Sequence, residues 1–332
     1  MNVLTLSTLL WAAPLPNDTM PSRDGDSSHE APDPVINGDI EAGYQAAVGL
    51  GAGGFTLCSG SIITPRIILT AAHCSADLPP ELIVAFGEAY VGTESSQPDY
   101  RLSFADGMTH PDYRPLSGSF LGEYDIGVLV LAEDSPVAPV WPRLTRLKDR
   151  EVDDAEVVSV GYGLTETESS GQKRSATLVV DEMDDMFLIS FVASNPGGTS
   201  ICSGDSGGPQ YHINEDGEIE QWAVHSWADG ACGFQSGSTR TDVAADWILE
   251  QIESVHGTTD RCAIFSAYGD GTCDTDCELP DIDCFESVPA FLDEAYGPPN
   301  RDLDIGGCTS APMAPGSLLL AWLACLGVRR RA

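Results

Sequence analysis

The chain has 332 residues, enough for one or two domains with a full-sized hydrophobic core. Acidic residues outnumber basic residues by 51 to 16, and the formal net charge is −35. A polyanion of this kind repels phosphate backbones and anionic lipids, which excludes nucleic acid as a partner. The surplus of acidic residues instead favours solubility outside the cell.

Ten cysteines indicate how the chain is stabilised and in which compartment it folds. Their even number and their clustering are typical of disulfides formed in an oxidising environment. Zinc ligation is the alternative, but no cluster has the paired cysteine or histidine spacing that zinc sites favour. The cysteines lie at positions 58, 74, 202, 232, 262, 273, 277, 284, 308 and 325.

The N-terminal part of the chain is expected to precede the folded body. A short apolar run from Val3 to Ala13 ends in small residues, so residues 1–13 are interpreted as a signal peptide. Residues 14–34 are rich in Pro, Ser, Asp and Gly and contain few large apolar residues. This composition predicts a disordered leader or pro-segment.

From Val35 to about residue 255, short apolar runs alternate with Gly, Pro and Asp, which predicts an all-β body made of many short strands. One segment, residues 243–252, instead has the apolar periodicity of a helix, with Val243, Trp247, Ile248 and Ile252 on one face. The body is therefore expected to close with a helix. The main apolar runs are 46–50, 61–63, 67–70, 82–86, 126–131, 157–160, 178–180 and 222–226.

A histidine follows the third of these runs, in the sequence Leu-Thr-Ala-Ala-His-Cys that ends at Cys74. Taken alone, His73 is best interpreted as a core histidine with satisfied hydrogen bonds. Cys58 lies sixteen residues before Cys74, so a disulfide between them would connect the two strands of a hairpin beside His73.

An aspartate opens the next long apolar run, in Tyr-Asp-Ile-Gly-Val-Leu-Val-Leu. Burial of Asp125 costs free energy unless the carboxylate is hydrogen-bonded or paired. The two interpretations are a strand or turn cap and a carboxylate that orients an imidazole.

A glycine-rich hexapeptide, Gly204 to Pro209, reads Gly-Asp-Ser-Gly-Gly-Pro. Glycines on both sides of Ser206 permit backbone conformations that a side chain would forbid. Such a loop can present the hydroxyl outward and aim its amides at one spot, where they would stabilise an oxyanion. A lone glycine-rich turn would only change the chain direction.

His73, Asp125 and Ser206 occur in the order His, Asp, Ser, within motifs that resemble those of the trypsin/chymotrypsin family of serine endopeptidases. The resemblance covers the chain from about Val35 to Val255. It implies two six-stranded antiparallel β-barrels with the active site between them, followed here by a small disulfide-rich segment. Two alternatives remain: a binding module that keeps the protease fold without activity, and an esterase that uses the same triad.

The resemblance also implies roles for individual residues. Ser206 would be the nucleophile, His73 the general base and Asp125 the residue that orients the imidazole. The amides of Gly204 and Ser206 would form the oxyanion hole.

A second implied feature is activation by cleavage. Val35 begins Val-Ile-Asn-Gly, which resembles the mature N-terminus of the family, and its new amino group would pair with Asp205. Pro34 precedes Val35 where the family has Arg or Lys, so a trypsin-like activating protease is not expected.

The substrate pocket is inferred from the same resemblance. Its floor position carries Ser200 rather than an aspartate, so a charge partner for Arg or Lys is missing. The neutral, narrowed pocket predicts cleavage after small or medium apolar residues. Cys202 and Cys232 would form the disulfide that braces it. The pocket residues are Ser200, Ile201, Ser226, Trp227, Ala228 and Ser238.

Residues 256–300 combine four cysteines with many aspartates and few apolar residues, so disulfides would have to hold this segment together. It faintly resembles a Lin-12/Notch repeat that lacks one cysteine pair. That resemblance implies the disulfides Cys262–Cys277 and Cys273–Cys284, with calcium on aspartates. A solvated acidic knot without metal is the alternative, and no other cofactor is expected. The candidate ligands are Asp270, Asp274, Asp276, Asp281 and Asp283.

Residues 301–332 contain Gly-Gly-Cys308, an apolar run at about 318–328 and three terminal arginines. The run is shorter than the roughly 20 residues of a spanning helix. A short membrane anchor is one interpretation, but the order of features resembles the MYXO-CTERM sorting tail of myxobacteria. We therefore expect a bacterial, exported endopeptidase, secreted or displayed on the cell surface after a transient membrane association. It is expected to act as a monomer on protein or peptide substrates.

Overall fold

The computed structural model describes residues 35–284, apart from 77–78, 116–121, 166–168, 215–216, 230–231 and 276. It divides into two compact units, the first ending at Phe265 and the second beginning at Ser266. The predicted signal peptide, the leader and the sorting tail with Cys308 and Cys325 lie outside the described residues. Among the helices that the structure does describe, none is long and apolar enough to cross a membrane.

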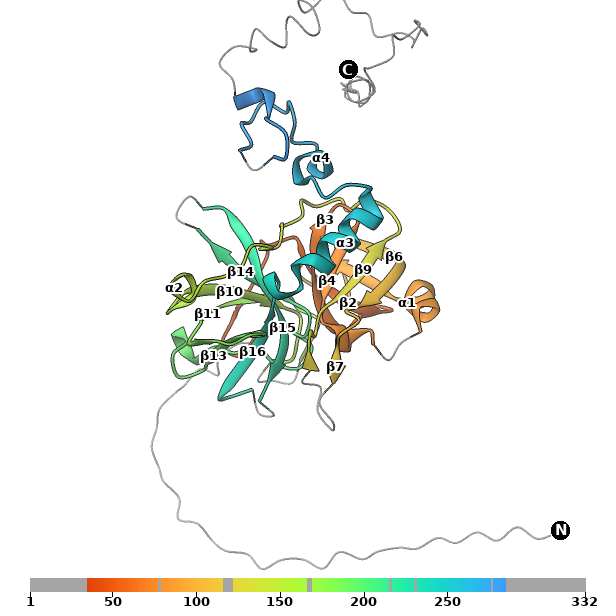
Figure 1. Ribbon diagram of the computed structural model, residues 1–332. Helices are drawn as coiled ribbons and strands as arrows, with labels where there is room; N and C mark the ends of the chain where they lie inside the picture. The colour runs from red at the N-terminus through yellow and green to blue at the C-terminus, as the bar shows by residue number, and fades with distance from the viewer. Residues whose placement is uncertain are drawn as a thin grey trace, which may run out of the picture. The chain divides into compact units, whose positions relative to one another are not determined.

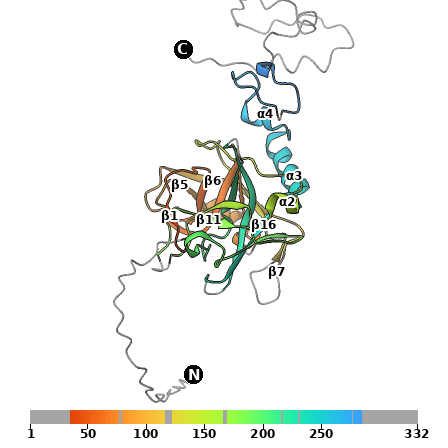
Figure 2. The same cartoon turned by 90° about the vertical axis from the view of Figure 1, so that its left-hand side faces the viewer.

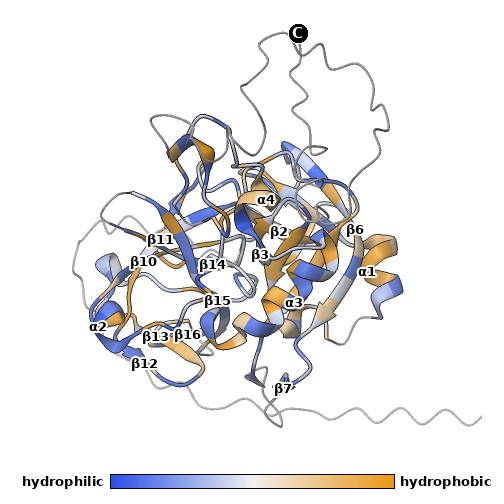
Figure 3. Ribbon diagram, turned by 45° about the horizontal axis from the view of Figure 1, so that its top comes forward, coloured by the Kyte–Doolittle hydropathy of each residue, from blue (hydrophilic) through white to orange (hydrophobic). Residues whose placement is uncertain are grey.

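The first half of the larger unit is a closed six-stranded antiparallel barrel (Figure 1). Its interior is filled by side chains such as Val48, Ile62 and Leu131, which are 5% exposed or less. In Figure 3 the strands β2 and β3 are coloured as largely hydrophobic, in keeping with this burial. The strands follow the order β2 (Ala47–Ala52), β3 (Phe55–Thr64), β4 (Ile67–Thr70), β9 (Gly127–Leu131), β6 (Tyr100–Thr109) and β5 (Glu88–Val91).

The second half is an antiparallel sheet of eight strands. Two short strands at its edges, β1 and β12, extend it beyond the six strands expected, and β1 pairs with β11 (Figure 2). The barrel, this sheet and the closing helix confirm the chymotrypsin-like all-β class. The order is β1 (Asp39–Ile40), β11 (Arg174–Val179), β10 (Glu156–Gly161), β14 (Pro209–Ile213), β15 (Ile219–Ala228), β16 (Gln235–Arg240), β13 (Phe187–Phe191) and β12 (Glu182–Met183).

Short elements connect and flank the two sheets. The strands β7 (Arg114–Pro115) and β8 (Gly122–Glu123) form a separate two-stranded ribbon just before Asp125. The helical elements before the closing helix are α1 (Pro80–Phe86), α2 (Asp149–Val152), and the 3₁₀ turns η1 (Ala72–Cys74), η2 (Pro196–Gly198) and η3 (Asp242–Ala244).

The closing helix α3 (Ala245–His256) packs its apolar face on the barrel. Ile248 and Ile252 are fully buried in one cluster with Leu69 and Val128 from β4 and β9. Val243, expected on the same helical face, lies in the 3₁₀ turn η3 that leads into α3. The helix ends at Gly257, whose left-handed conformation (φ 72°) suits glycine at this position.

A short helix, α4 (Arg261–Phe265), follows α3 within the same unit. The ring of Phe265 packs edge-on against Trp141, with ring centroids 5.6 Å apart. The compact unit therefore continues to Phe265.

Tyr162, which occupies a position where the family often has Trp, connects the two halves. It lies just after β10 of the second sheet and is completely buried. Its hydroxyl donates a hydrogen bond of 2.5 Å to the carbonyl oxygen of Gly92, which follows β5 of the barrel. This bond lies within the packed interface between the two halves, where water does not compete for either partner.

Replacement of Tyr162 by Phe should lower the free energy of unfolding by about 1–3 kcal/mol, because the Gly92 carbonyl would lose its buried donor. Tyr100→Phe is the control, since Tyr100 is 48% exposed and should change stability little. The free energy of unfolding of both variants is measured by urea denaturation, monitored by tryptophan fluorescence. Equal stability of the two variants would contradict this role for the hydroxyl.

Candidate active site

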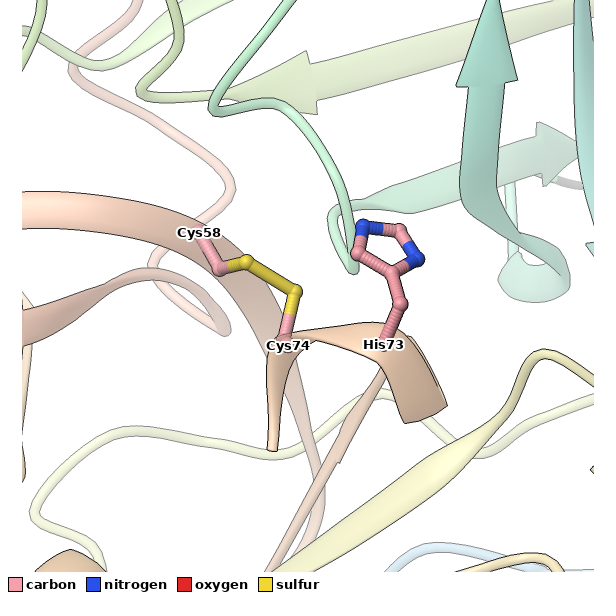
Figure 4. A group of neighbouring side chains, drawn as sticks. All are labelled: Cys58, His73 and Cys74. Atoms are coloured by element: carbon pink, nitrogen blue, oxygen red, sulfur yellow. A yellow bond between two sulfur atoms is a disulfide. The ribbon is translucent and has the colours of Figure 1, made fainter. Parts of the chain in front are cut away.

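His73 is placed by the end of a buried strand and by a disulfide. The strand β4 is buried along its whole length and leads into the 3₁₀ turn η1, which carries His73 and Cys74. A disulfide joins Cys74 to Cys58 of β3, as the spacing suggested (Figure 4). The turn is therefore fixed covalently to the barrel, directly beside the imidazole.

The structure brings His73 and Asp125 into direct contact. The His73 Nδ1 atom lies 2.7 Å from the Asp125 Oδ2 atom, and the backbone N–H of His73 donates to Oδ1 at 2.9 Å. A carboxylate oxygen only accepts hydrogen bonds, so Nδ1 carries the hydrogen, and in the neutral ring Nε2 is the nitrogen with the acceptor lone pair. The imidazole thus has a fixed tautomer and a fixed orientation.

A third donor completes the environment of the carboxylate. The hydroxyl of Ser226 on β15 donates to Asp125 Oδ2 at 2.6 Å. Asp125 is completely buried, whereas the His73 side chain is 13% exposed. The three hydrogen bonds offset the cost of burying the carboxylate. The sequence placed Ser226 in the substrate pocket but gave no indication of this bond.

The glycine-rich loop lies against the same part of the barrel. The Ser206 carbonyl oxygen accepts a hydrogen bond from the backbone N–H of Ser59 at 2.8 Å and lies 3.5 Å from Cys74 Sγ. Ser206 is thereby placed beside the residue that follows His73. Gly207 has φ 85°, and a Cβ atom there would lie 2.1 Å from Thr70 Oγ1, so only glycine fits.

Ser59 holds this loop with its side chain as well. Its hydroxyl donates to the carbonyl oxygen of Gly204 at 2.9 Å and accepts from the backbone N–H of Tyr162 at 3.0 Å. Within the described part of the chain, the amides of Gly204 and Ser206 donate to no other group. They therefore remain available to a ligand.

Asp205 is the most deeply buried acid of the loop, with no exposed surface. Its Oδ1 atom accepts from the Gly163 amide and its Oδ2 atom from the Cys202 amide, both at 2.8 Å. Burial raises the pKa of Asp205 to about 7, although both amides act to lower it. Cβ atoms at Gly161 or Gly163 would approach the carboxylate to within 2.7 Å or less, so both glycines are needed.

The segment proposed as the mature N-terminus lies in the interior. Val35 is 2% exposed, and Ile36 forms an antiparallel bridge with Ser200. The side chain of Asn37 donates to the carbonyl oxygen of Gly197 at 2.8 Å. These contacts connect the start of the body to the segment that carries the predicted pocket floor.

The raised pKa of Asp205 predicts a pH dependence of stability in the chain that is still intact before Val35. The folded form binds a proton more tightly than the unfolded form, whose pKa is close to 3.8. The contribution of Asp205 is therefore complete below about pH 4 and is lost as the pH rises through about 7. In a Ser206→Ala background, Asp205→Asn should flatten the unfolding free energy over this range. Asp185→Asn is the exposed control, and equal slopes in the two variants would contradict the prediction.

The predicted pocket residues come together around β15 and β16. Ser200, Ile201, Ser226 and Ser238 are buried, and the Ser200 hydroxyl donates to the carbonyl oxygen of Ile201 at 3.1 Å. Ile201 belongs to the core cluster of the second sheet, against which Ala228 packs. A disulfide joins Cys202 to Cys232.

The structure adds polar groups to this region that sequence reasoning missed. His225 immediately precedes Ser226, is completely buried, and lies 3.1 Å from the Ser238 hydroxyl through its Nδ1 atom. Burial lowers the pKa of its imidazole to about 3. The sequence did contain one indication of this group, because His225 directly precedes Ser226 of the predicted pocket.

A surface hollow of about 440 Å³ is lined in part by Trp227, one of the predicted pocket residues. Trp227 of β15 and Glu123 of β8 both line it, and they are the near neighbours of Ser226 and Asp125 in the sequence. It could hold part of a bound chain. Its lining consists of Gly122, Glu123, Asp184, Asp185, Met186, Phe187 and Trp227.

The described residues of the larger unit do not build a metal site. Within the described residues, one group of potential ligands converges, formed by His73, Cys58 and Cys74 (Figure 4). Both sulfur atoms belong to a disulfide and are not available as thiolate ligands. The carboxylate of Glu88 accepts hydrogen bonds from Arg101 and Tyr90. The Arg101 guanidinium supplies the positive charge there.

The second unit is organised around Asp281. Its carboxylate is 2% exposed and accepts hydrogen bonds from the amides of Asp274, Gly269 and Asp283, at 3.0, 3.2 and 3.3 Å. These amides lower the pKa of the carboxyl group. Asp283 likewise accepts from the Gly271 amide at 2.7 Å. The two carboxylates therefore cap turns of this unit.

Disulfides reinforce this unit. Cys273 is joined to Cys284, and Cys277 is also disulfide-bonded, as is Cys262 at the end of the larger unit. Among the described aspartates of the segment, no three carboxylates converge as metal ligands.

Asp281→Ala should expose residues 266–284 to proteolysis, because three backbone amides would lose their acceptor. Asp270→Ala is the matched control, since that carboxylate accepts from the Thr272 amide in an exposed turn. Limited proteolysis with peptide mapping measures the effect, and a calcium chelator should change neither protein. Loss of protection on chelation of the unmutated chain would instead establish a metal-dependent knot.

Comparison with known proteins agrees with this architecture. Residues 37–248 match the family described as Trypsin. The chain therefore belongs to the trypsin family.

Its relatives include proteins of different names. Hypodermin-B of Hypoderma lineatum is 28% identical over 244 residues, which cover 67% of this chain and 90% of that protein. Glucanase inhibitor protein 2 of Phytophthora sojae is 27% identical over 234 residues, which cover 64% of this chain and 78% of that protein. Coagulation factor XII of Cavia porcellus is 28% identical over 228 residues, which cover 60% of this chain and 37% of that protein.

Proposed function

We propose that the chain is a serine endopeptidase in which Ser206, His73 and Asp125 form the catalytic triad. The observation that carries this proposal is the hydrogen bond between His73 and the buried Asp125, made directly beside the loop that holds Ser206. Membership of the trypsin family supports the same reaction class.

The mechanism follows from the tautomer that Asp125 imposes on His73. His73 Nε2 takes the proton of the Ser206 hydroxyl as its Oγ atom attacks the peptide carbonyl, and then gives that proton to the leaving amine. Water then attacks the carbonyl of the acyl-enzyme, with His73 again taking and returning the proton. The bond to Ser206 breaks, and the carboxylic acid product leaves. Asp125 keeps the proton on Nδ1 in place and stabilises the imidazolium that forms.

The amides of Gly204 and Ser206 are proposed to bind the oxyanion of the tetrahedral intermediate. Loss of one such donor typically raises the barrier by about 3–4 kcal/mol. The hydrogen bond between Ser59 and the Gly204 carbonyl supports this role, because it fixes one peptide group of the loop.

Cleavage before Val35 is proposed to complete the site. The new amino group would reach Asp205, whose buried carboxylate otherwise has only amide partners. An ammonium partner would lower the pKa of Asp205 and stabilise its charged form. Pro34 requires an activating protease that does not depend on Arg or Lys at this bond.

Substrates are proposed to be proteins or peptides cut after small or medium side chains rather than after Arg or Lys. The absence of an acid at Ser200 and the bulk of Ile201 support this size and charge limit. The apolar preference predicted from the sequence remains a prediction.

The disulfides indicate a protein that folds outside the cytoplasm. Export by a bacterium, sorting through the C-terminal tail with a transient membrane association, and action as a monomer are part of the proposal.

A binding module without activity is the second candidate function. The similarity to a protein named as a glucanase inhibitor favours it, because that name describes binding to another enzyme. The retained His73–Asp125 hydrogen bond favours the enzyme instead. An esterase with the same triad is distinguished by matched ester and peptide substrates.

A fluorophosphonate probe should label Ser206, and Ser206→Ala should abolish the labelling while leaving the unfolding midpoint unchanged. Asp125→Asn should lower kcat for a peptide substrate by about 10⁴-fold, because the imidazole would take the wrong tautomer. Mass spectrometry of the labelled peptide and steady-state kinetics measure the two effects. A correctly processed chain that is neither labelled nor active would exclude the enzyme and favour the binding module.

A further inference from the structure

The second sheet carries a group of polar side chains on its buried face. Ser190 of β13 is directly opposite Ser236 of β16, and His225 of β15 is directly opposite Ser238 of β16. Directly opposite residues of antiparallel strands share a face, and so do residues two apart on one strand. Ser190, Ser236, Ser238 and His225 therefore lie on one face, where each is 2% exposed or less.

This face continues toward the predicted substrate pocket. Leu188, opposite Ser238 on the same face, belongs to the core cluster that also contains Ile201. Ser236 is opposite Ala228, another predicted pocket residue. The four polar side chains are thus next to the walls that sequence reasoning assigned to the pocket.

Two atoms of the group have no hydrogen-bond partner among the residues that the structure describes, namely His225 Nε2 and Ser190 Oγ. A buried polar atom without a partner costs about 1–3 kcal/mol. Native proteins rarely retain such atoms unless water or a ligand satisfies them. Nδ1 of His225 is already used by Ser238, so Nε2 is the atom left for a ligand.

His225 also lies directly against the nucleophile loop. Its carbonyl oxygen accepts from the Gly207 amide at 2.7 Å, and its amide donates to the Gly208 carbonyl oxygen at 2.8 Å. A Cβ atom on Gly208 would lie 2.9 Å from the Cδ2 atom of the ring. A side chain that entered beside Ser206 would therefore approach this imidazole.

Building on the proposed function, we propose that His225 recognises an acidic side chain, Glu or Asp, at the residue whose carboxyl side is cut. The imidazole Nε2–H would donate to the substrate carboxylate, with the hydroxyls of Ser190, Ser236 and Ser238 around it. An apolar side chain would leave His225 Nε2 and Ser190 Oγ unsatisfied. A cationic side chain would find no counter-charge among these four groups.

The electrostatic surroundings of His225 are compatible with this ion pair. Burial is the sole cause of the lowered pKa of the free imidazole, and no charged side chain contributes. The groups that face the ring are Ser238 of β16 and Gly208 of the nucleophile loop. The carboxylates of Asp125 and Asp205 each already accept at least two hydrogen bonds from other groups. A bound carboxylate would raise the pKa of His225, so binding takes up one proton.

The first test measures binding in the Ser206→Ala chain, where the result does not depend on turnover. Product-like peptides identical except for a C-terminal Glu, Gln or Ala are compared by calorimetry. The Glu peptide should bind at least about tenfold more tightly than the Ala peptide, a difference typical of one charge-assisted hydrogen bond. The preference should weaken as the pH rises from 5 to 8.

The second variant, His225→Val with Ser206→Ala, should bind the Glu and Ala peptides equally and without pH dependence. In the active chain, His225→Val should lower kcat/KM for the Glu substrate by at least about tenfold and change the Ala substrate little. Equal fluorophosphonate labelling of Ser206 in the unmutated and His225→Val chains shows that the site is still folded. Tighter binding of the Ala peptide, or a Glu preference that survives His225→Val, would overturn the proposal. Absence of labelling would count against the peptidase function alone, because the binding test stands without it.

Discussion

The site depends on one buried carboxylate. Asp125 is withdrawn completely from solvent, and three donors from two distant parts of the chain offset the cost of its burial. Two of those donors belong to His73, so the same bonds that satisfy the acid fix the imidazole. The third comes from Ser226 on β15, which is why the second sheet must be in register before the barrel residues can function.

Much of the fold and part of the site could be predicted from the sequence. Short apolar runs separated by turn residues indicated an all-β body, and the apolar periodicity near Ile248 located the closing helix. His73, Asp125 and Ser206 could be proposed as site residues because each lies in a distinctive local motif. Such motifs encode the conformation of a turn or a strand end, which is a property of neighbouring residues.

The remaining features depend on contacts between segments far apart in the sequence. Ser226 lies 101 residues from Asp125, and no local pattern specifies that its hydroxyl donates to that carboxylate. The pairing of His225 with Ser238 follows from the register of β15 and β16, and a register shift marks β15 at this point. Asp281 was one of several candidate metal ligands in the sequence, and no local pattern showed that its carboxylate accepts backbone amides of the turns around it. In each case the chemistry comes from tertiary structure.

Ser59 has a further consequence for motion. Through its amide and its hydroxyl, this one residue of β3 bonds Ser206, Gly204 and Tyr162, which belong to the second half of the unit. A hinge movement that separated the two halves would break all three bonds at once. Opening of the interface and displacement of the glycine-rich loop would then be a single cooperative event, so breathing motions of the two halves would disrupt the site abruptly rather than gradually.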